Sequence, residues 1–200
     1  MALGVPVLGV VGYFTNMSYA TEVGVPKEQP VEFSHLHHVG DDGIDCRYCH
    51  TTVDKGPSAG MPSTHTCMTC HSQLWSDSPE LELVRESFRT GKPIKWVRVH
   101  DLPDFAYFDH SIHVKKGVSC VSCHGRVDRQ PLAMKEQDLT MKWCLDCHRN
   151  PAKALRPREF VYQLDWKPKK EDQQTMGKRL MDEYHVLGTF QLTNCSTCHR

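Results

Sequence analysis

The most apolar stretch of the chain lies at its N-terminus, where residues 1–21 contain no charged side chain. A helix of that length spans about 31 Å, close to the thickness of the hydrocarbon core of a bilayer. The stretch lacks the basic start of a cleaved signal peptide, although Ser18-Tyr19-Ala20 has the small-x-small form of a cleavage site. We therefore expect residues 1–21 to be a retained membrane anchor helix, with a cleaved signal peptide as the alternative.

The apolar pattern predicts two further helices, both amphipathic. In the first, Ser78 is a good N-cap, Pro79 suits the first helical position and Gly91 ends the helix. The second runs from about residue 171 to residue 187, because apolar residues recur there at spacings of 4, 4 and 3. That stripe consists of Met176, Leu180, Tyr184 and Leu187. Two proline-containing segments are expected to be extended: a linker over residues 22–32, and residues 93–107.

All ten cysteines of the chain belong to five copies of the motif Cys-x-x-Cys-His, the attachment signature of c-type haem. On one helical turn, residues i and i+3 face the same side, so the two thiols can bond the two vinyl groups of one porphyrin. The histidine that follows binds the iron as an axial ligand. We therefore expect five haem c groups, at Cys46/Cys49/His50, Cys67/Cys70/His71, Cys120/Cys123/His124, Cys144/Cys147/His148 and Cys195/Cys198/His199.

Other interpretations of Cys-x-x-Cys are a redox pair, half of a zinc site or a disulfide framework. They are disfavoured because a histidine follows every copy, although only 13 of the 200 residues are histidine. The chain is formally neutral, with 24 basic and 24 acidic residues, so no basic excess indicates nucleic acid as a partner. Covalent haem attachment takes place outside the bacterial cytoplasm. The expected location is therefore the bacterial inner membrane, with the soluble domain on the periplasmic side.

An internal duplication organises the haem-binding part of the chain. Residues Phe33–His38 precede the first motif and residues Phe108–His113 precede the third, and both have the form Phe-x-His-x-x-His. Two dihaem repeats are therefore expected, at 33–71 and 108–148, with a fifth haem near 195–199. The expected fold is one pentahaem cytochrome c domain over residues 33–200, with short α-helices, many loops and little β-structure. The porphyrins must supply much of its core, because five haems share so short a chain.

Eight histidines remain outside the attachment motifs, enough to give every iron a second axial ligand. Four of them occupy the duplicated motif, where the i, i+3 spacing lets two rings on one turn face two neighbouring irons. These four are His35, His38, His110 and His113. For the fifth iron we expect His100, with His185, His65 and Met141 as the alternatives.

Irons closed by two protein ligands exchange electrons but offer no position to a substrate. The motifs therefore predict an electron-transfer subunit without its own catalytic site. One alternative is a stand-alone periplasmic multihaem carrier that serves a reductase, and another is a multihaem reductase with an open haem. The apolar N-terminus argues against the first alternative, and the surplus of histidines argues against the second.

Two runs of sequence are more specific than the haem motif itself. They are residues 93–104, Pro-Ile-Lys-Trp-Val-Arg-Val-His-Asp-Leu-Pro-Asp, and residues 123–128, Cys-His-Gly-Arg-Val-Asp. On these runs, and on matching stretches that cover most of residues 33–200, the chain resembles the pentahaem cytochrome c subunit of alternative complex III. The further stretches are 33–35, 46–50, 61–64, 78–79, 84–87, 110–113, 143–151 and 155–158.

This resemblance implies a subunit of a quinol:acceptor oxidoreductase in a respiratory or photosynthetic chain. In that family, membrane-embedded subunits oxidise the quinol, and an iron–sulfur subunit lies beside the pentahaem cytochrome. Electrons leave to a monohaem cytochrome c, a copper protein or an oxidase. The family's pentahaem subunit is held by one transmembrane helix, which agrees with the expected anchor. The expected partners are those subunits and membrane lipid, with no nucleic acid.

Overall fold

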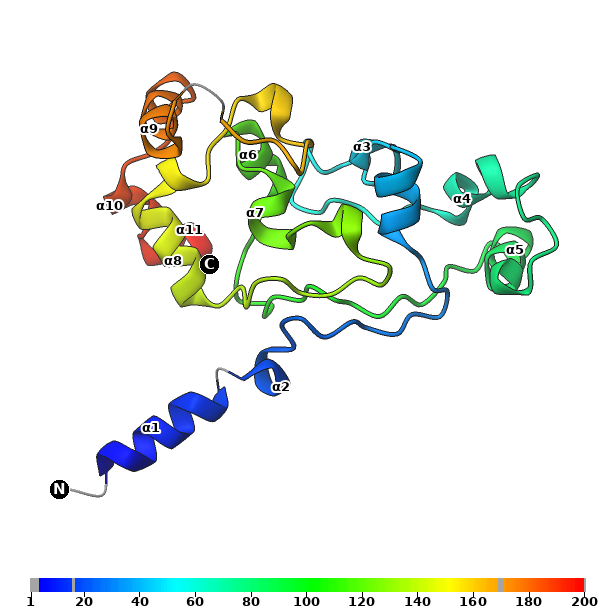
Figure 1. The fold of residues 1–200 in the computed structure, drawn as a ribbon, viewed down its shortest axis with the longest axis horizontal. Helices are drawn as coiled ribbons and strands as arrows, with labels where there is room; N and C mark the ends of the chain where they lie inside the picture. Colours follow the sequence, from blue (N-terminus) through cyan, green and yellow to red (C-terminus); the bar gives the residue numbers. More distant parts are fainter. Residues whose placement is uncertain (1–3, 16, 169–170, 200) are drawn as a thin grey trace.

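The computed structural model describes residues 4–15, 17–168 and 171–199. Its α-helices are α1 (Gly4–Thr15), α2 (Ser18–Thr21), α3 (Cys46–Cys49), α4 (Thr64–His71), α5 (Glu82–Thr90), α6 (His110–Lys115), α7 (Cys120–His124), α8 (Met141–Arg149), α9 (Gln173–Glu183), α10 (Thr189–Leu192) and α11 (Cys195–Cys198). A π-helical turn, η1 (Leu36–Asp41), and the 3-10 turns η2 (Pro79–Leu81), η3 (Val127–Arg129), η4 (Pro151–Lys153) and η5 (Arg158–Phe160) complete the elements (Figure 1).

The predicted helix-rich, loop-rich architecture with little β-structure is confirmed. Within the described ranges, the only strand-like pairings are two isolated β-bridges. One joins Val23 to Lys135 and the other joins Val118 to Leu155. Long loops between short helices are what a chain adopts when bound cofactors, and not paired strands, are to fill its interior.

The predicted anchor over residues 1–21 is wrong as a single long helix. The apolar run forms α1, which ends at Thr15, and a separate helix, α2, begins at Ser18. Serine, threonine and asparagine have weaker helix propensity than leucine or alanine, and such residues stand where the two helices separate. Residues 1–3 and 16 of the predicted anchor lie outside the described ranges. Among the residues that are described, no helix combines the length and the apolar character needed to cross a membrane.

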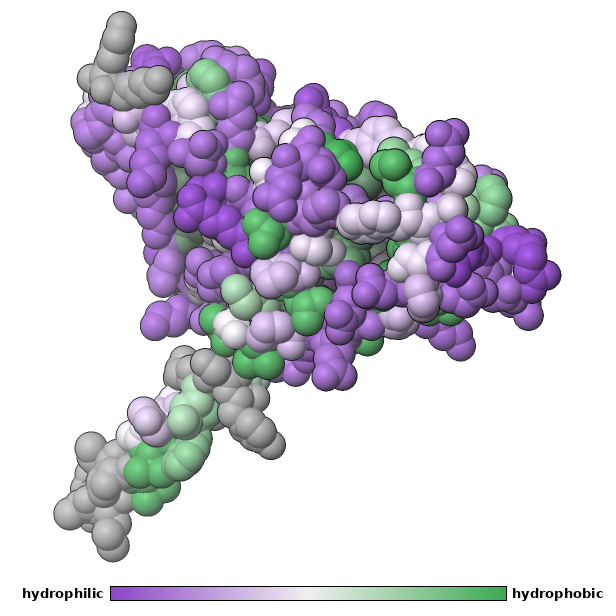
Figure 2. Space-filling view, turned by 45° about the vertical axis from the view of Figure 1, so that its right-hand side comes forward, coloured by the Kyte–Doolittle hydropathy of each residue, from purple (hydrophilic) through white to green (hydrophobic). Residues whose placement is uncertain are grey.

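Helix α1 extends away from the body of the protein (Figure 1). Its 12 residues make a rod about 18 Å long. Figure 2 shows that this rod is apolar, whereas the surface of the body is mostly hydrophilic. The exposed apolar side chains on α1 are Val7, Val10, Val11, Tyr13 and Phe14.

The segment predicted as a linker, residues 22–32, lies against another part of the chain. The backbone amides of Gly24 and Lys27 donate hydrogen bonds to the carbonyls of Lys135 and Ala133, at 2.8 and 3.1 Å. The segment is extended, as its prolines predict, and it is tied to the loop before α8.

The helix predicted from the Ser78 cap is confirmed. The Ser78 hydroxyl accepts a hydrogen bond from the backbone amide of Glu80, and the first turn is the 3-10 turn η2, which leads into α5. Gly91 ends α5 with φ at 69°, in the left-handed region that glycine adopts without strain. Residues 93–107, predicted to be extended, contain no helix.

The second predicted helix is α9, which is shorter than expected. Asp172 caps its N-terminus by accepting hydrogen bonds from the amides of Gln174 and Thr175. Three of the four residues of the predicted stripe are buried: Met176, Leu180 and Tyr184. The fourth, Leu187, is 54% exposed because the helix has already ended and the chain turns at His185, where φ is 50°.

The protein core is small. Its main cluster joins α9 to the loop after η4 and consists of Leu155, Met176, Leu180 and Tyr184. The remaining buried apolar side chains are scattered along the chain: Val31, Val53, Val84, Ala152, Val161 and Leu164. So few buried side chains leave room for cofactors at the centre of the body.

Gly177 lies where α9 crosses η4, and we expect its replacement by alanine to destabilise the protein. A Cβ atom at this position would overlap the backbone carbonyl of Ala152, which the side-chain amide of Gln173 already holds at 3.0 Å. Overpacking of this kind costs about 1–3 kcal/mol, which exceeds the gain in helix propensity. Thermal unfolding measures the loss. Gly56→Ala is the matched control, because a Cβ there meets open space, and an equal Tm for the two variants would contradict the prediction.

Candidate haem-binding site

Each attachment motif lies on a short helix, as predicted: α3, α4, α7, α8 and α11. Polar residues before three of these helices cap the first turn. Asp45 accepts a hydrogen bond from the amide of Arg47, Thr140 from Trp143, and Asn194 from Ser196. The caps fix the start of these three helices, α3, α8 and α11, from which both cysteines of a motif project within one turn.

Four of the five attachment histidines are oriented by the same kind of hydrogen bond. In each, Nδ1 faces a backbone carbonyl oxygen. The pairs are His50 with Gly60 at 2.8 Å, His71 with Leu74 at 3.1 Å, His148 with Leu192 at 2.9 Å and His199 with Phe105 at 3.0 Å. Donation from Nδ1–H selects the tautomer whose Nε2 is free to bind a metal. The four rings are therefore prepared as iron ligands.

Three predicted axial histidines face three attachment histidines. The ring centroids are 6.0 Å apart in His38–His71, 6.3 Å in His110–His124 and 6.2 Å in His113–His148. Metal ions bond imidazole nitrogen at about 2 Å, so two imidazoles on opposite sides of one iron have centroids about 6 Å apart. The separations fit one iron between each pair of rings.

His35 lies near a fourth attachment histidine, His50. Burial, followed by the charge of His50, lowers the pKa of His35 to about 4, so the ring is neutral at pH 7. Its Nδ1 is buried and has no hydrogen-bond partner. A neutral, buried ring nitrogen without a partner is costly unless it binds a metal. The residues at this position therefore also fit an iron.

The duplicated motif builds the same ring geometry twice. Phe33 stacks on His38 with centroids 4.4 Å apart, and its ring meets His35 edge-on at 4.9 Å. In the second copy, Phe108 stacks on His113 at 4.6 Å and meets His110 edge-on at 4.7 Å. The phenylalanine of Phe-x-His-x-x-His thus separates two histidines that point in different directions.

Backbone carbonyls also hold three of the motif's histidines. His38 Nδ1 faces the carbonyl of Ser34 at 2.8 Å, and His113 Nδ1 faces that of Asp109 at 2.7 Å. His110 is different, because its Nδ1 faces the carbonyl of Pro57, in the first repeat, at 2.7 Å. This contact ties the two repeats together at the centre of the body.

None of three remaining candidates for the fifth iron, His100, His65 and Met141, lies about 6 Å from an attachment histidine, as the rings of these pairs do. The rings of His100 and His124 are only 4.3 Å apart, with 3.2 Å between His100 Nε2 and His124 Nδ1. Burial lowers the pKa of His100, so the ring is neutral at pH 7. His65 packs edge-on against Phe88, and Met141 is 66% exposed. The assignment of a second ligand to the fifth iron stays a prediction.

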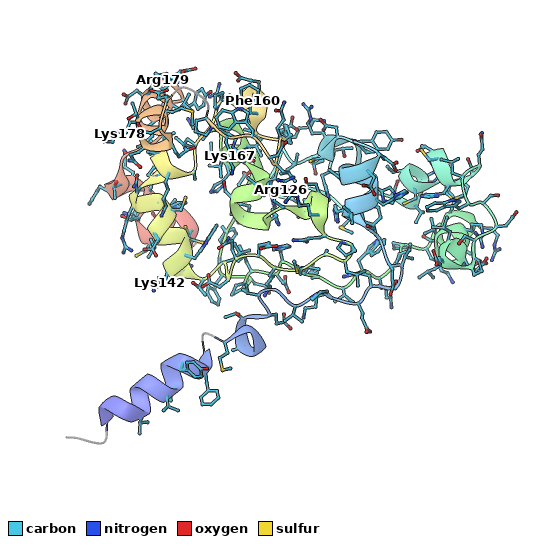
Figure 3. All side chains as sticks on the ribbon, in the orientation of Figure 1. Arg126, Lys142, Phe160, Lys167, Lys178 and Arg179 are labelled. Carbon is cyan, nitrogen blue, oxygen red and sulfur yellow. The ribbon has the colours of Figure 1, made fainter. Side chains whose placement is uncertain are left out.

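The five attachment motifs lie in one row through the body, which we call the file of motifs. Their order along this row differs from their order in the sequence. Besides burial, a thiol of the neighbouring motif raises the pKa of a cysteine at each step: Cys67 acts on Cys49, Cys46 on Cys120, Cys147 on Cys123, and Cys198 on Cys144. The spatial order is therefore second, first, third, fourth, fifth. In Figure 1, α4, α3, α7 and α8 succeed one another in this order along the long axis of the body. Figure 3 labels Lys178 and Arg179, exposed on α9, at the end opposite α5.

Exposure to solvent divides the ten cysteines that were predicted to bind haem. Eight are partly buried, whereas Cys70 of the second motif and Cys195 of the fifth are exposed. Cys70 and Cys195 are exposed because the second and fifth motifs lie at the two ends of the file, where each has a neighbouring motif on one side only. Haem attachment at all ten cysteines stays a prediction, including Cys70 and Cys195 at the surface.

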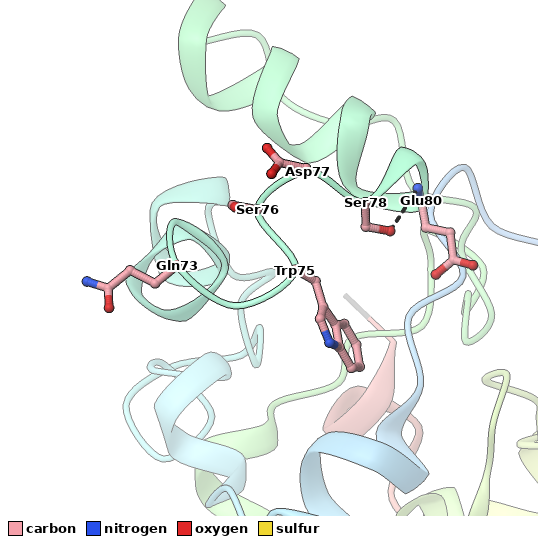
Figure 4. Close-up of a pocket in the computed structure, with 6 residues that line it drawn as sticks. All are labelled: Gln73, Trp75, Ser76, Asp77, Ser78 and Glu80. Carbon is pink, nitrogen blue, oxygen red and sulfur yellow. Dashed lines mark hydrogen bonds between the residues drawn. The ribbon is translucent and has the colours of Figure 1, made fainter.

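A shallow surface hollow of about 500 Å³ lies beyond α4, at the end of this file (Figure 4). Its lining residues are Gln73, Trp75, Ser76, Asp77, Ser78 and Glu80. The Trp75 ring stacks on His37 at 5.4 Å and lies 6.1 Å from the ring of His71. None of the lining residues is histidine or cysteine, so the hollow borders the His38–His71 pair through Trp75 but contains no predicted haem ligand.

The zinc and disulfide alternatives gain no support from the structure. None of the ten cysteines forms a disulfide. Among the described residues, no group of three or more histidine, cysteine, aspartate or glutamate side chains converges as a metal site would require. Pairs of facing histidines beside pairs of cysteines suit haem c better than a tetrahedral ion.

The crossing angles of the paired rings predict distinct electron paramagnetic resonance signals. The ring planes of His38 and His71 cross at 67°, whereas those of His110–His124 and His113–His148 differ by only 7° and 23°. Crossed imidazole planes leave two iron d orbitals nearly equal in energy, which makes a low-spin ferric signal strongly anisotropic. We expect one signal with a much larger maximum g value than the others, and its loss in His38→Ala. The same spectrum before and after that substitution would contradict the pairing.

Comparison with known proteins gives two family matches and one close relative. The description "Cytochrome c3" matches residues 112–200, and "Class III cytochrome C family" matches residues 14–90. The chain is 33% identical, over 177 residues, to the multihaem cytochrome c subunit of menaquinone reductase from Nitratidesulfovibrio vulgaris (strain Hildenborough). The alignment covers 87% of this chain and 78% of the relative.

Proposed function

The chain belongs to the class III multihaem cytochromes c, and from this premise we propose that it relays electrons within a membrane-bound quinol oxidoreductase of the alternative complex III type. It would take electrons from an iron–sulfur and quinol-oxidising module and pass them to an acceptor in the periplasm. Haem c supplies reversible one-electron exchange at an iron closed by two protein ligands. The chain's own residues attach, orient and shield the haems.

The observation that carries this proposal is the single file of attachment motifs. A file has two ends, one at α4 and α5 and the other at α8, α9 and α11 (Figure 1). Residues that would hold redox groups in a row, with paired histidine rings at three of the iron positions, suit electron transfer between two partners that dock at different places. A catalytic cytochrome would instead need one position left open to substrate.

We propose five haem c groups, one at each motif, because each motif lies on a helix and each attachment histidine has a hydrogen-bond partner at Nδ1. The body lies on the periplasmic side of the bacterial inner membrane, where covalent haem attachment takes place. Helix α1, with its exposed apolar side chains, packs against the membrane subunits of the complex.

The same file of motifs would also serve the opposite direction of flow. The relative's name describes a menaquinone reductase, and its identity to this chain favours that interpretation as the second candidate. Electrons would then enter from a periplasmic donor and leave toward a quinone. The two candidates share every residue role and differ only in the redox partners at the two ends.

The test is purification of the tagged protein from native membranes in mild detergent. We expect an iron–sulfur subunit and quinone-binding membrane subunits to co-purify, and a menaquinol analogue to reduce the haems rapidly in stopped flow. The control is the same subunit stripped of its partners in harsher detergent, which quinol should not reduce. Haem oxidation by menaquinone alone would favour the second candidate. Release of a monomer by salt washing would overturn both in favour of a stand-alone carrier.

A further inference from the structure

His124 differs from the other four attachment histidines in its hydrogen-bond partner. Those four place Nδ1 against a backbone carbonyl, whereas Nδ1 of His124 faces Nε2 of His100 at 3.2 Å. We infer that His100 is a positioning residue for His124. It accepts a hydrogen bond from the Nδ1–H of His124, holds that ring toward its iron and increases the ring's basicity.

The distances distinguish this role from axial ligation. The rings of His100 and His124 are 4.3 Å apart at their centroids, which is too close for an iron between them. On its other side, His124 faces His110 with centroids 6.3 Å apart and planes within 7°. The iron position thus lies between His110 and His124, and Nε2 of His100, one of the two nitrogens through which that ring could bind a metal, faces Nδ1 of His124 instead.

An imidazole nitrogen is a stronger base than an amide carbonyl oxygen. When His100 Nε2 accepts the hydrogen bond, the Nδ1–H proton of His124 is drawn further from the ring than a carbonyl oxygen would draw it. The His124 ring therefore carries more negative charge. Outer-shell partners of this kind raise ligand basicity and tune the metal. More charge on the ligand stabilises ferric over ferrous iron, so His100 lowers the reduction potential at the third motif relative to the same site with a carbonyl acceptor.

The third motif occupies the centre of the file, with two motifs on each side. The potential at that position therefore bears on transfer in either direction. The inference rests on the proposed haem at the third motif, but it does not depend on which way electrons flow.

The test compares His100→Ala and His100→Gln with the unaltered holoprotein. The readouts are haem content, the electron paramagnetic resonance spectrum and a spectroelectrochemical titration. In His100→Ala we expect full haem content, only low-spin signals, a changed g value for one nearly parallel pair, and one redox component shifted to higher potential. In His100→Gln the amide oxygen can accept the same hydrogen bond, although it is a weaker base than imidazole. The potential of that component should therefore lie between its value in His100→Ala and its value in the unaltered protein.

His37→Ala is the matched control, because His37 contacts the ring of the axial candidate His38 at 5.3 Å without a hydrogen bond to it. It should leave every potential in place. A new high-spin signal in His100→Ala would mean that His100 is itself an axial ligand and would overturn the inference. An unchanged titration at full haem content would overturn it as well, whether measured in His100→Ala or, if that variant loses haem, in His100→Gln. Haem absent from the third motif of the unaltered protein would instead overturn the proposed site.

Discussion

Replacement of His110 by alanine is expected to convert one haem from low spin to high spin and to interrupt electron flow between the two ends of the protein. His110 faces His124 at 6.3 Å with nearly parallel planes, so its removal leaves one side of that iron position without a protein ligand. Changes in outer-shell partners alone typically cost about 10–100-fold in metal affinity or activity. Loss of a ligand at the central motif should exceed this, and quinol-dependent turnover of the intact complex measures it.

Two variants separate the loss of the ligand from general damage. His110→Met should restore a low-spin iron while raising its potential, because methionine ligation favours ferrous iron. His37→Ala should leave spin state and turnover unchanged, since His37 contacts His38, Trp75, Asp41 and Asp42 but is not one of the rings paired with an attachment histidine across an iron position. Full turnover by His110→Ala would mean that the file of motifs has a bypass around its third member.

Much of this site could be predicted from local sequence. The motif Cys-x-x-Cys-His predicts haem attachment from residues within about one helical turn. The duplicated Phe-x-His-x-x-His likewise predicts two histidines on one turn, and the phenylalanine ring packs against both. Caps and apolar spacing also placed α5 and α9, because these depend on neighbouring residues. Where a local rule ended, the prediction failed, as at Leu187, which lies past the turn that ends α9.

The rest depends on contacts between distant parts of the chain. Backbone carbonyls of Gly60, Leu192 and Phe105 orient three attachment histidines, and a carbonyl carries no signature in the sequence. The contact of His100 with His124 spans 24 positions and joins an extended segment to a helix. The spatial order of the motifs, and with it the exposure of the cysteines at the two ends, likewise follows from how the repeats fold against each other. The N-terminal helices are shorter than the apolar composition predicted, because polar residues interrupt the run.

Without covalent haem attachment, the chain is expected to lose its cooperative thermal unfolding transition. The main protein core is one cluster around Leu155 and Leu180, at one end of the body. Elsewhere three attachment histidines face histidines of η1 and α6 with ring centroids about 6 Å apart, and this space needs a porphyrin to be filled. Protein produced without haem-attachment enzymes should therefore melt gradually in circular dichroism. A sharp transition near the Tm of the holoprotein would contradict this.

Single-motif variants sharpen the same prediction. Cys120 and Cys123 lie at the centre of the file, where burial raises the pKa of Cys123 to about 12. Replacement of both cysteines by serine should abolish the cooperative transition, because the motifs on both sides lose the haem against which they would pack. Cys195 and Cys198 lie on α11 at the end of the file, and Cys195 is exposed. The same replacement there should lower the Tm modestly and keep the transition sharp. Equal effects of the two variants would mean that the haems stabilise the chain independently and not through their shared packing.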